Sequence, residues 1–140
     1  MSWTSSAARS GCKSHAARDF GSAPAGGPLG PSREAALATS GRVEIDTPRV
    51  GGSISLVGGR IDDVVLKDYR ASVEGNSPNI QLLHPAAMPD GYYAEVGYIG
   101  GEGSGSVPGP DTVWTVEGEQ RLTPATPVTL TYTNETGLTF

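Results

Sequence analysis

Adjacent carboxylates are the first residues in this sequence that could do chemistry. Asp62 and Asp63 are neighbours, and paired carboxylates can act as general acid and base or hold a metal ion. They fall in a segment with the apolar content of a β-strand, where successive side chains point to opposite faces. We therefore predict that Asp62 and Asp63 lie in a solvated turn-to-strand transition and share no substrate.

Metal ligands and nucleophiles are few. The sequence has one cysteine, Cys12, and two histidines, His15 and His84, which excludes an internal disulfide and a zinc site built from several cysteines. Serine is abundant, but no Gly-x-Ser-x-Gly motif presents one as a nucleophile. We predict no catalytic residue, no metal and no cofactor, and we expect that the protein is not an enzyme.

A glycine-rich run over residues 100–105 superficially suits a phosphate site. No Gly-Lys-Ser/Thr motif closes this run, and no helical pattern follows that could present its N-terminus to a phosphate. We interpret residues 100–110 as a surface loop. Asp90 and Asp111 lie beside Gly91 and Pro110, where aspartate commonly serves turns.

Four aromatic residues could form a binding surface: Tyr92, Tyr93, Tyr98 and Trp114. Aromatic side chains line the sugar-binding grooves of many β-sandwich modules, but more often they pack the core of the sandwich. Both interpretations stay open at this point, and the ligand-binding residues are unknown.

Composition and charge narrow the class of protein. The 140 residues include 20 glycines and 11 prolines, which argues against a helical bundle, and the hydrophobic fraction of 36% is low for a self-sufficient domain. Residues 1–42 carry a net charge of +3, whereas residues 43–140 carry −8. Phosphate contact requires clustered lysine and arginine, so we expect no nucleic-acid partner. No apolar run reaches the length of a membrane span, and no secretory signal is recognisable.

Short strands separated by turns are the dominant pattern after residue 42. Gly58-Gly59 predicts a tight turn between strands at 51–57 and 61–67, and the apolar run at 64–66 indicates a bulge near Asp63 or burial on both faces. In the strand before this turn, Ile54 and Leu56 alternate with serines. The remaining strands are predicted at 43–46, 80–83, 92–99, 112–116 and 128–133, with a hairpin turn at 134–137.

The first part of the chain has a different texture. Residues 1–31 are low in complexity and show no apolar periodicity, which predicts disorder. Ser32 could cap a helical turn over residues 33–37, but the segment is too short to be stable alone, and we interpret it as a frayed linker. The predicted division is a disordered head and linker at 1–41 and a β domain at 42–140, which we expect to be truncated after Phe140.

Four stretches, at 43–69, 79–83, 92–99 and 112–140, occur in a recognisable series. The first has a strand, a glycine turn and an apolar strand ending in tyrosine, and the second contains the residues Gln-Leu-Leu. The third leads into a glycine- and proline-rich loop, and the fourth runs from Val-Trp-Thr-Val-Glu to a closing Gly-Leu-Thr-Phe hairpin. Together they resemble the periplasmic domain of the YidC/Oxa/Alb family of membrane protein insertases.

This resemblance implies an all-β fold, a partial β-supersandwich similar to galactose mutarotase, behind the disordered N-terminal segment. It implies a fragment of a protein that assists insertion and folding of inner-membrane proteins, with or without the Sec translocon. The implied partners are Sec accessory proteins and nascent membrane proteins, and the implied location is the periplasmic face of the inner membrane. The insertase helices and any substrate-contacting residue have no counterpart here. The alternative is a secreted β-sandwich module that binds a carbohydrate or a protein.

Overall fold

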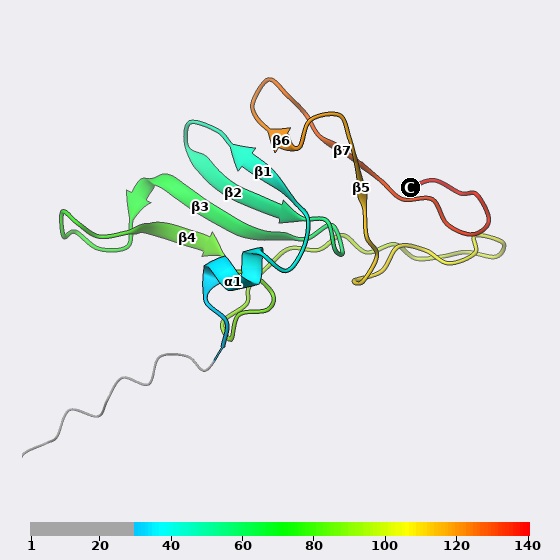
Figure 1. Cartoon of the computed structure of the whole chain (residues 1–140), viewed down its shortest axis with the longest axis horizontal. Coiled ribbons are helices and arrows are strands. Elements are labelled where there is room, and N and C mark those ends of the chain that lie inside the picture. The colour runs from blue at the N-terminus through cyan, green and yellow to red at the C-terminus, as the bar shows by residue number, and fades with distance from the viewer. Residues whose placement is uncertain (1–29) are drawn as a thin grey trace, which may run out of the picture.

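The computed structural model describes residues 30–140, and this part of the chain is built mostly of strands (Figure 1). The all-β prediction is therefore confirmed. The elements are α1 (Arg33–Leu37), β1 (Arg42–Asp46), β2 (Val50–Ser55), β3 (Ile61–Arg70), β4 (Asn79–Leu83), β5 (Thr115–Glu117), β6 (Arg121–Leu122) and β7 (Thr129–Thr131). Among the described residues no helix is long and apolar enough to cross a membrane.

The strands form two sheets. The larger has the order β4-β3-β2-β1-β6, and all its neighbours are antiparallel except β6, which runs parallel to β1. The smaller sheet is the antiparallel pair of β5 and β7, which lies beside the larger sheet in Figure 1. The supersandwich arrangement stays a prediction.

The predicted glycine turn between β2 and β3 is confirmed. Gly58 and Gly59 have φ angles of +75° and +61°, in the left-handed region that residues with a Cβ atom seldom adopt. The turn reverses the chain so that β3 pairs along β2. The predicted turn at 134–137 also forms, with the Gly137 amide donating to the Asn134 carbonyl at 3.0 Å.

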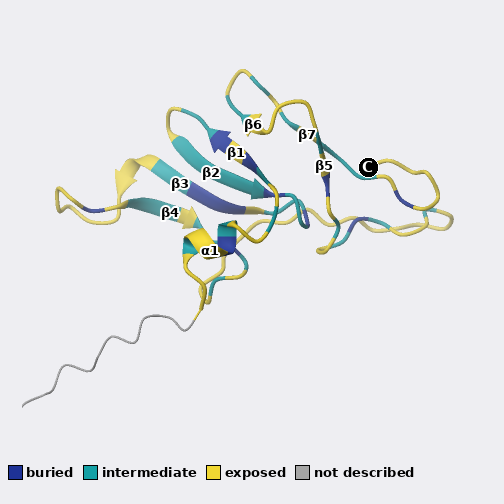
Figure 2. Cartoon of the chain, in the orientation of Figure 1, coloured by how far each residue is buried: buried dark blue, intermediate teal, exposed yellow. Residues whose placement is uncertain are grey.

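The apolar core is small and lies where β1, β2 and β3 meet. Val43 is completely buried, and Ile45 and Val64 are nearly so (Figure 2). Val43 pairs with Ile54 across the β1–β2 ladder, while Ile45 and Val64 both pair with Gly52. Since side chains alternate between the faces of a sheet, this register gathers the apolar residues on one face.

Gly52 lets β2 and β3 approach each other closely. Its φ angle is +141°, and a Cβ placed there would lie 1.9 Å from the backbone oxygen of Asp63. That oxygen belongs to the ladder and has no room to move away. Glycine is therefore required at this position for the β2–β3 register.

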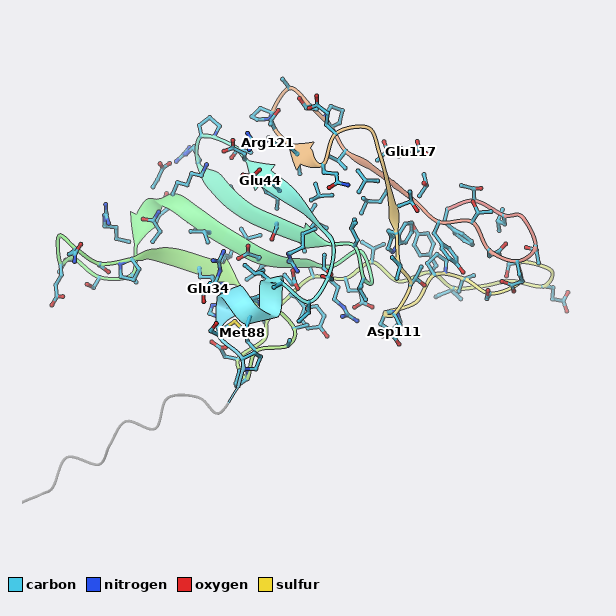
Figure 3. All side chains as sticks on the ribbon, in the orientation of Figure 1. Glu34, Glu44, Met88, Asp111, Glu117 and Arg121 are labelled. Carbon is cyan, nitrogen blue, oxygen red and sulfur yellow. The ribbon has the colours of Figure 1, made fainter. Side chains whose placement is uncertain are left out.

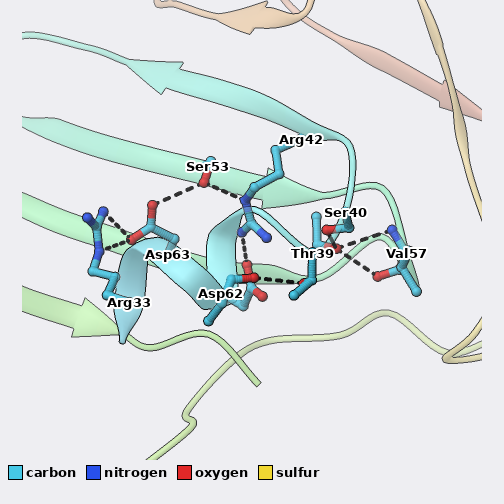
Figure 4. A network of polar contacts seen from close by, with 10 residues as sticks. Arg33, Thr39, Ser40, Arg42, Ser53, Val57, Asp62 and Asp63 are labelled. Atoms are coloured by element: carbon cyan, nitrogen blue, oxygen red, sulfur yellow. Dashed lines mark hydrogen bonds and ion pairs between the residues drawn. The ribbon is translucent and has the colours of Figure 1, made fainter. Parts of the chain in front are cut away.

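Of the two alternatives that the apolar run left open, the structure shows the bulge near Asp63, and this bulge changes where the carboxylates point. The register of β2 against β3 shifts between Ser53 and Ile54, so Asp62 is an extra residue in the β3 strand. Both carboxylates are buried, with Asp63 only 2% exposed. The prediction of a solvated transition that separates them is wrong, because the bulge brings both into one polar network (Figure 4).

This network ties α1 to the sheet. Arg33 of α1 donates to the Asp63 carboxylate from Nε at 3.0 Å and from Nη2 at 2.7 Å, and Ser53 Oγ donates to the same group at 3.0 Å. Arg42 pairs with Asp62 and also donates to Ser53 Oγ. Each buried carboxylate therefore has a cation beside it, as burial of charge requires.

The interpretation of residues 32–37 as a frayed linker is wrong. Ser32 caps α1 by accepting from the Ala35 amide at 3.3 Å, and Ala36 is buried against the sheet. A helix of five residues is marginal by itself. The contact of Arg33 with Asp63 supplies the tertiary stabilisation that a local pattern does not show. The division into a head at 1–41 and a domain at 42–140 stays a prediction, and residues 1–29 lie outside the described part.

Ser55 is the buried residue of β2, whereas Ile54 and Leu56 are only partly covered. Its hydroxyl lies 3.0 Å from Ser40 Oγ, on the side of the sheet that carries the polar network. The alternation identified the strand correctly, and α1 with its following loop decides which face is covered.

The strand expected at 92–99 does not form. Only Tyr92 pairs with His84, and only Ala94 pairs with Ile61, as isolated bridges. His84 directly follows β4 and Ile61 begins β3, so the segment crosses the ends of two strands without running along either. An alternating pattern cannot produce a strand where no strand edge lies alongside.

Strand β6 was not predicted, because it is only two residues long within a polar segment. It pairs Arg121 with Glu44 and Leu122 with Ile45. The Arg121 Nη2 atom lies 2.8 Å from a Glu44 carboxylate oxygen, and both side chains are labelled in Figure 3.

We expect Asp63→Ala to lower the free energy of unfolding by about 2–3 kcal/mol, because it removes a buried carboxylate and leaves Arg33 and Ser53 without their acceptor. Asp68→Ala is the matched control. It breaks the exposed Arg49–Asp68 pair and should cost less than about 0.5 kcal/mol. Urea unfolding followed by circular dichroism measures both, and equal losses would contradict the role given to Asp63.

A second prediction concerns the close approach at Gly52. We expect Gly52→Ala to destabilise the fold by at least about 3 kcal/mol, since the new Cβ would overlap the Asp63 carbonyl oxygen. Gly75→Ala, with no atom within 4 Å of the added Cβ, should change stability by less than about 0.5 kcal/mol. The midpoint of thermal unfolding distinguishes them, and a stable Gly52→Ala protein would refute the argument.

Candidate binding site

Aromatic side chains from three separate segments gather next to the smaller sheet. The ring centroids of Tyr98 and Trp114 lie 6.1 Å apart, and those of Tyr98 and Phe140 lie 5.3 Å apart, edge to face. Tyr132 stacks on Phe140 at 6.3 Å and meets Trp114 at the same distance. These separations are typical of favourable aromatic pairs.

Trp114 is held by the glycine turn of the larger sheet. Its amide donates to the Leu56 carbonyl at 2.8 Å, and the Gly58 amide donates to the Thr112 carbonyl at 2.8 Å. A Cβ on Gly59 would lie 3.1 Å from Trp114 Nε1, so the turn is glycine where the indole packs against it. The turn that joins β2 to β3 therefore also positions Trp114.

A cavity of about 190 Å³ opens beside the indole, and we call it the Trp114 cavity. It is lined by Gly58, Gly59, Val96, Tyr98, Trp114 and Leu130. Trp114 is 8% exposed, and Val96, at 72%, is well exposed to solvent. The Trp114 Nε1 atom is buried and has no hydrogen-bond partner among residues 30–140. Because an indole N–H can only donate, this atom lacks an acceptor.

An ion pair orients the chain at one side of this cavity. Arg60 Nε donates to Glu95 Oε2 at 2.6 Å, and its Nη2 donates to the Pro110 carbonyl at 2.9 Å. The hydrogen bond to Glu95 is the main cause that raises the pKa of Arg60. The guanidinium also lies over the ring of Tyr93, 5.4 Å from its centroid. These contacts fix residues 93–95 next to Val96.

A second cavity, also of about 190 Å³, lies between α1, the sheet and the loop at Pro85. The polar side chains that line it already have partners: Arg42 bonds Asp62 and Ser53, and Ser55 bonds Ser40. They belong to the network that holds α1. This cavity offers a ligand no free polar group of that network, so the Trp114 cavity is the better candidate site.

The residues considered for catalysis or metal binding have separate partners. His84 Nδ1 lies 3.0 Å from Asp90 Oδ2, whereas Asp62 and Asp63 are paired with Arg42 and Arg33. Among residues 30–140 no group of three or more His, Cys, Asp or Glu residues is placed to hold a metal ion. Cys12 and His15 lie outside the described residues.

The glycine-rich run is a loop, as predicted, and it is fastened to the C-terminal hairpin. The Ser106 hydroxyl donates to the Glu135 carboxylate and is the largest cause that lowers the pKa of that carboxyl. The Ser106 amide donates to Glu135 Oε1 at 2.8 Å and lowers this pKa further. The Asn134 side chain donates to the carbonyls of Ser104 and Ser106 at 2.8 Å each. The backbone groups of Ser104 and Ser106 are therefore hydrogen-bonded to the C-terminal hairpin.

Of the four aromatic residues named from the sequence, the structure brings two together. Tyr98 and Trp114 line the Trp114 cavity, whereas Tyr93 lies over Arg60 and Tyr92 is mostly exposed. Sequence reasoning missed Val96 and Leu130 as lining residues. Their alternation with Tyr98 and Tyr132 was visible in the sequence, but their convergence on one cavity from two distant segments was not.

Comparison with known proteins gives a consistent result. The family model of the YidC periplasmic domain matches residues 42–140. A membrane protein insertase YidC of Allorhizobium ampelinum is 64% identical over 109 residues, which is 78% of this chain and 18% of that protein. The insertase YidC of Sinorhizobium fredii is 60% identical over 109 residues, with the same two coverages. That of Brucella suis is 55% identical over 116 residues, 83% of this chain and 19% of the relative.

The chain thus spans about a fifth of the length of the curated relatives it matches. The resemblance predicted from the four stretches is confirmed, and the matched range includes β1 to β7 and the Trp114 cavity. Because the match covers residues 42–140 of 140, the chain belongs to the YidC periplasmic domain family.

Proposed function

We propose that this chain forms part of the periplasmic domain of a membrane protein insertase. Such an insertase assists insertion and folding of inner-membrane proteins, with or without the Sec translocon. The observation that carries the proposal is the 64% identity to an insertase YidC over 78% of the chain. Identity at this level over the β1–β7 region supports a common fold and a common place in the parent protein.

The role proposed for this region is binding and not catalysis. Among residues 30–140, the buried carboxylates pair with Arg33 and Arg42 inside the fold, and the Trp114 cavity is lined mainly by apolar side chains beside one free donor. Such a region contributes surface to an assembly. The proposed partners are Sec accessory proteins and, through the parent protein, nascent membrane proteins, and the proposed location is the periplasmic face of the inner membrane.

We expect residues 42–140 to replace the matching segment of the Allorhizobium ampelinum insertase without loss of function. A cysteine-free version of this chimera would carry either Val73→Cys or Val43→Cys, since Val73 is fully exposed and Val43 is completely buried. In intact spheroplasts, a membrane-impermeant maleimide should label Val73→Cys and leave Val43→Cys unlabelled. The chimera should also insert a test membrane protein at the rate of the parent.

The two cysteine positions separate the possible failures. Labelling of Val73→Cys only after the membrane is broken would refute the periplasmic location. Equal labelling of both cysteines would show that the segment does not fold in the parent protein. Correct labelling with a strong loss of insertion would contradict the proposed function while leaving the fold and location intact.

A further inference from the structure

The β5–β7 pair is attached to the larger sheet at two separate places. Residues 118–128 connect β5 to β7, and the middle of this connection is β6, which pairs with β1 (Figure 1). We call residues 118–128 the β6 segment. On the other side of β5, Val113 forms an isolated bridge with Val57, next to the glycine turn between β2 and β3. The two attachments differ in the kind of contact that holds them.

The attachment before β5 depends on backbone hydrogen bonds and on a buried side chain. The Trp114 amide donates to the Leu56 carbonyl at 2.8 Å, and the Trp114 side chain is buried. The ion pair of Arg60 with Glu95 lies nearby, and its side chains are only 19% and 27% exposed. Salt screens partly buried charges much less than exposed ones. We therefore expect this attachment to respond little to ionic strength.

The β6 segment is held by a very short ladder and by exposed charges. Strand β6 has two residues, and the Glu44 amide donates to the Gln120 carbonyl at 3.0 Å. Arg121 also contacts two carboxylates of β1. Its Nη2 lies 2.8 Å from Glu44 Oε2, and its Nη1 lies 3.5 Å from Asp46 Oδ2 (Figure 3). These three side chains are about half exposed, so salt can screen them.

A second cation extends these contacts into a network across three strands. Lys67 Nζ, on β3, donates to Asp46 Oδ1 at 3.0 Å and to the Thr47 carbonyl at 2.7 Å. The hydrogen bond from Lys67 is the largest cause that lowers the pKa of Asp46, and the charge of Arg121 lowers it further. A lowered carboxyl pKa stabilises the fold above the ordinary value of about 3.9, and this contribution is lost as the pH falls below it. At neutral pH the network is therefore fully charged, and ionic strength is the variable that acts on it.

We propose that the β6 segment is a charge-controlled clip, which releases β6 from β1 while the attachment at Trp114 stays closed. A single exposed ion pair contributes little, but an arginine shared by two carboxylates within a network contributes more. The ladder beside it has only two residue pairs, so the charges supply a large part of a small total. Segments with few buried contacts open locally, at a lower free energy than the core.

Opening of the clip changes which backbone groups are accessible. Within residues 30–140, β1 pairs only with β2 and β6, so release of β6 turns β1 into an edge strand. The meander of β1 to β4 stays paired, because β6 contributes to none of its ladders. This conformational step goes beyond the insertase role, since it assigns a local opening to Arg121 and its carboxylate partners.

The test follows amide hydrogen exchange of the full chain by NMR at neutral pH. The Glu44 amide reports on the β6 segment, and the Trp114 amide reports on the other attachment. The two conditions are about 10 mM and about 1 M NaCl, at which the Debye length is about 30 Å and about 3 Å. In the higher salt, protection of Glu44 should fall at least about fivefold, whereas that of Trp114 should change less than about twofold.

Two outcomes of this measurement would overturn the proposal. Equal losses of protection at Glu44 and Trp114 would show that β6 opens only together with the rest of the β5–β7 unit. A Glu44 amide that is unprotected at low salt would show that the clip is not closed.

Matched variants identify the charge that holds the clip. Arg121→Gln keeps a long polar side chain but removes the charge, and it should lower Glu44 protection at least about fivefold at low salt and abolish the salt response. Arg49→Gln is the control, because it breaks the exposed Arg49–Asp68 pair and should change Glu44 protection less than about twofold. Full protection in Arg121→Gln, or equal losses in both variants, would refute the clip. All these side chains are exposed, so neither variant should prevent folding.

Discussion

The burial of two neighbouring carboxylates is the constraint on which the rest of this structure depends. Asp62 and Asp63 are almost completely covered, and a buried charge must have a cation and hydrogen bonds beside it. Arg42 supplies the cation for one, and Arg33 supplies it for the other. Because Arg33 belongs to α1, a helix too short to persist alone becomes part of the domain. The same bulge that brings the carboxylates together also sets the register of β2 against β3.

Most strands could be predicted from local chemistry, because glycine turns and alternating residues carry the information within a few positions. Gly58-Gly59 and the run from Ile61 onward defined β2 and β3, including the bulge near Asp63. The failures have a common cause. Segment 92–99 has the composition of a strand but crosses strand ends, and β6 has little strand character but meets the free edge of β1. Both outcomes depend on neighbours far away in the sequence, which a local pattern does not contain.

The candidate site shows the same division. Tyr98 and Trp114 were recognisable as residues that could bind a ligand, because large aromatic side chains are common in binding sites and in cores alike. The sequence could not decide between these roles, and the structure gives Trp114 both. Its ring packs against Tyr132 and the glycine turn, while its Nε1 atom is left without an acceptor beside an apolar cavity. Trp114 is the centre of the candidate site, in preference to Tyr92 or Tyr93, because its Nε1 atom lacks an acceptor.

The parallel pairing of β6 with β1 has a consequence for the order in which the chain folds. Strands β1 to β4 follow one another and pair with their neighbours, so each pairing closes a short loop. The contact of Arg121 with Glu44 instead closes a loop of 77 residues, and long loops are entropically slow to close. We therefore expect the four-stranded meander of β1 to β4 to form before β6 pairs with β1. The β5–β7 pair also closes a short loop, so the late step is the joining of this second unit to the meander, where β6 meets β1 and Trp114 meets Leu56.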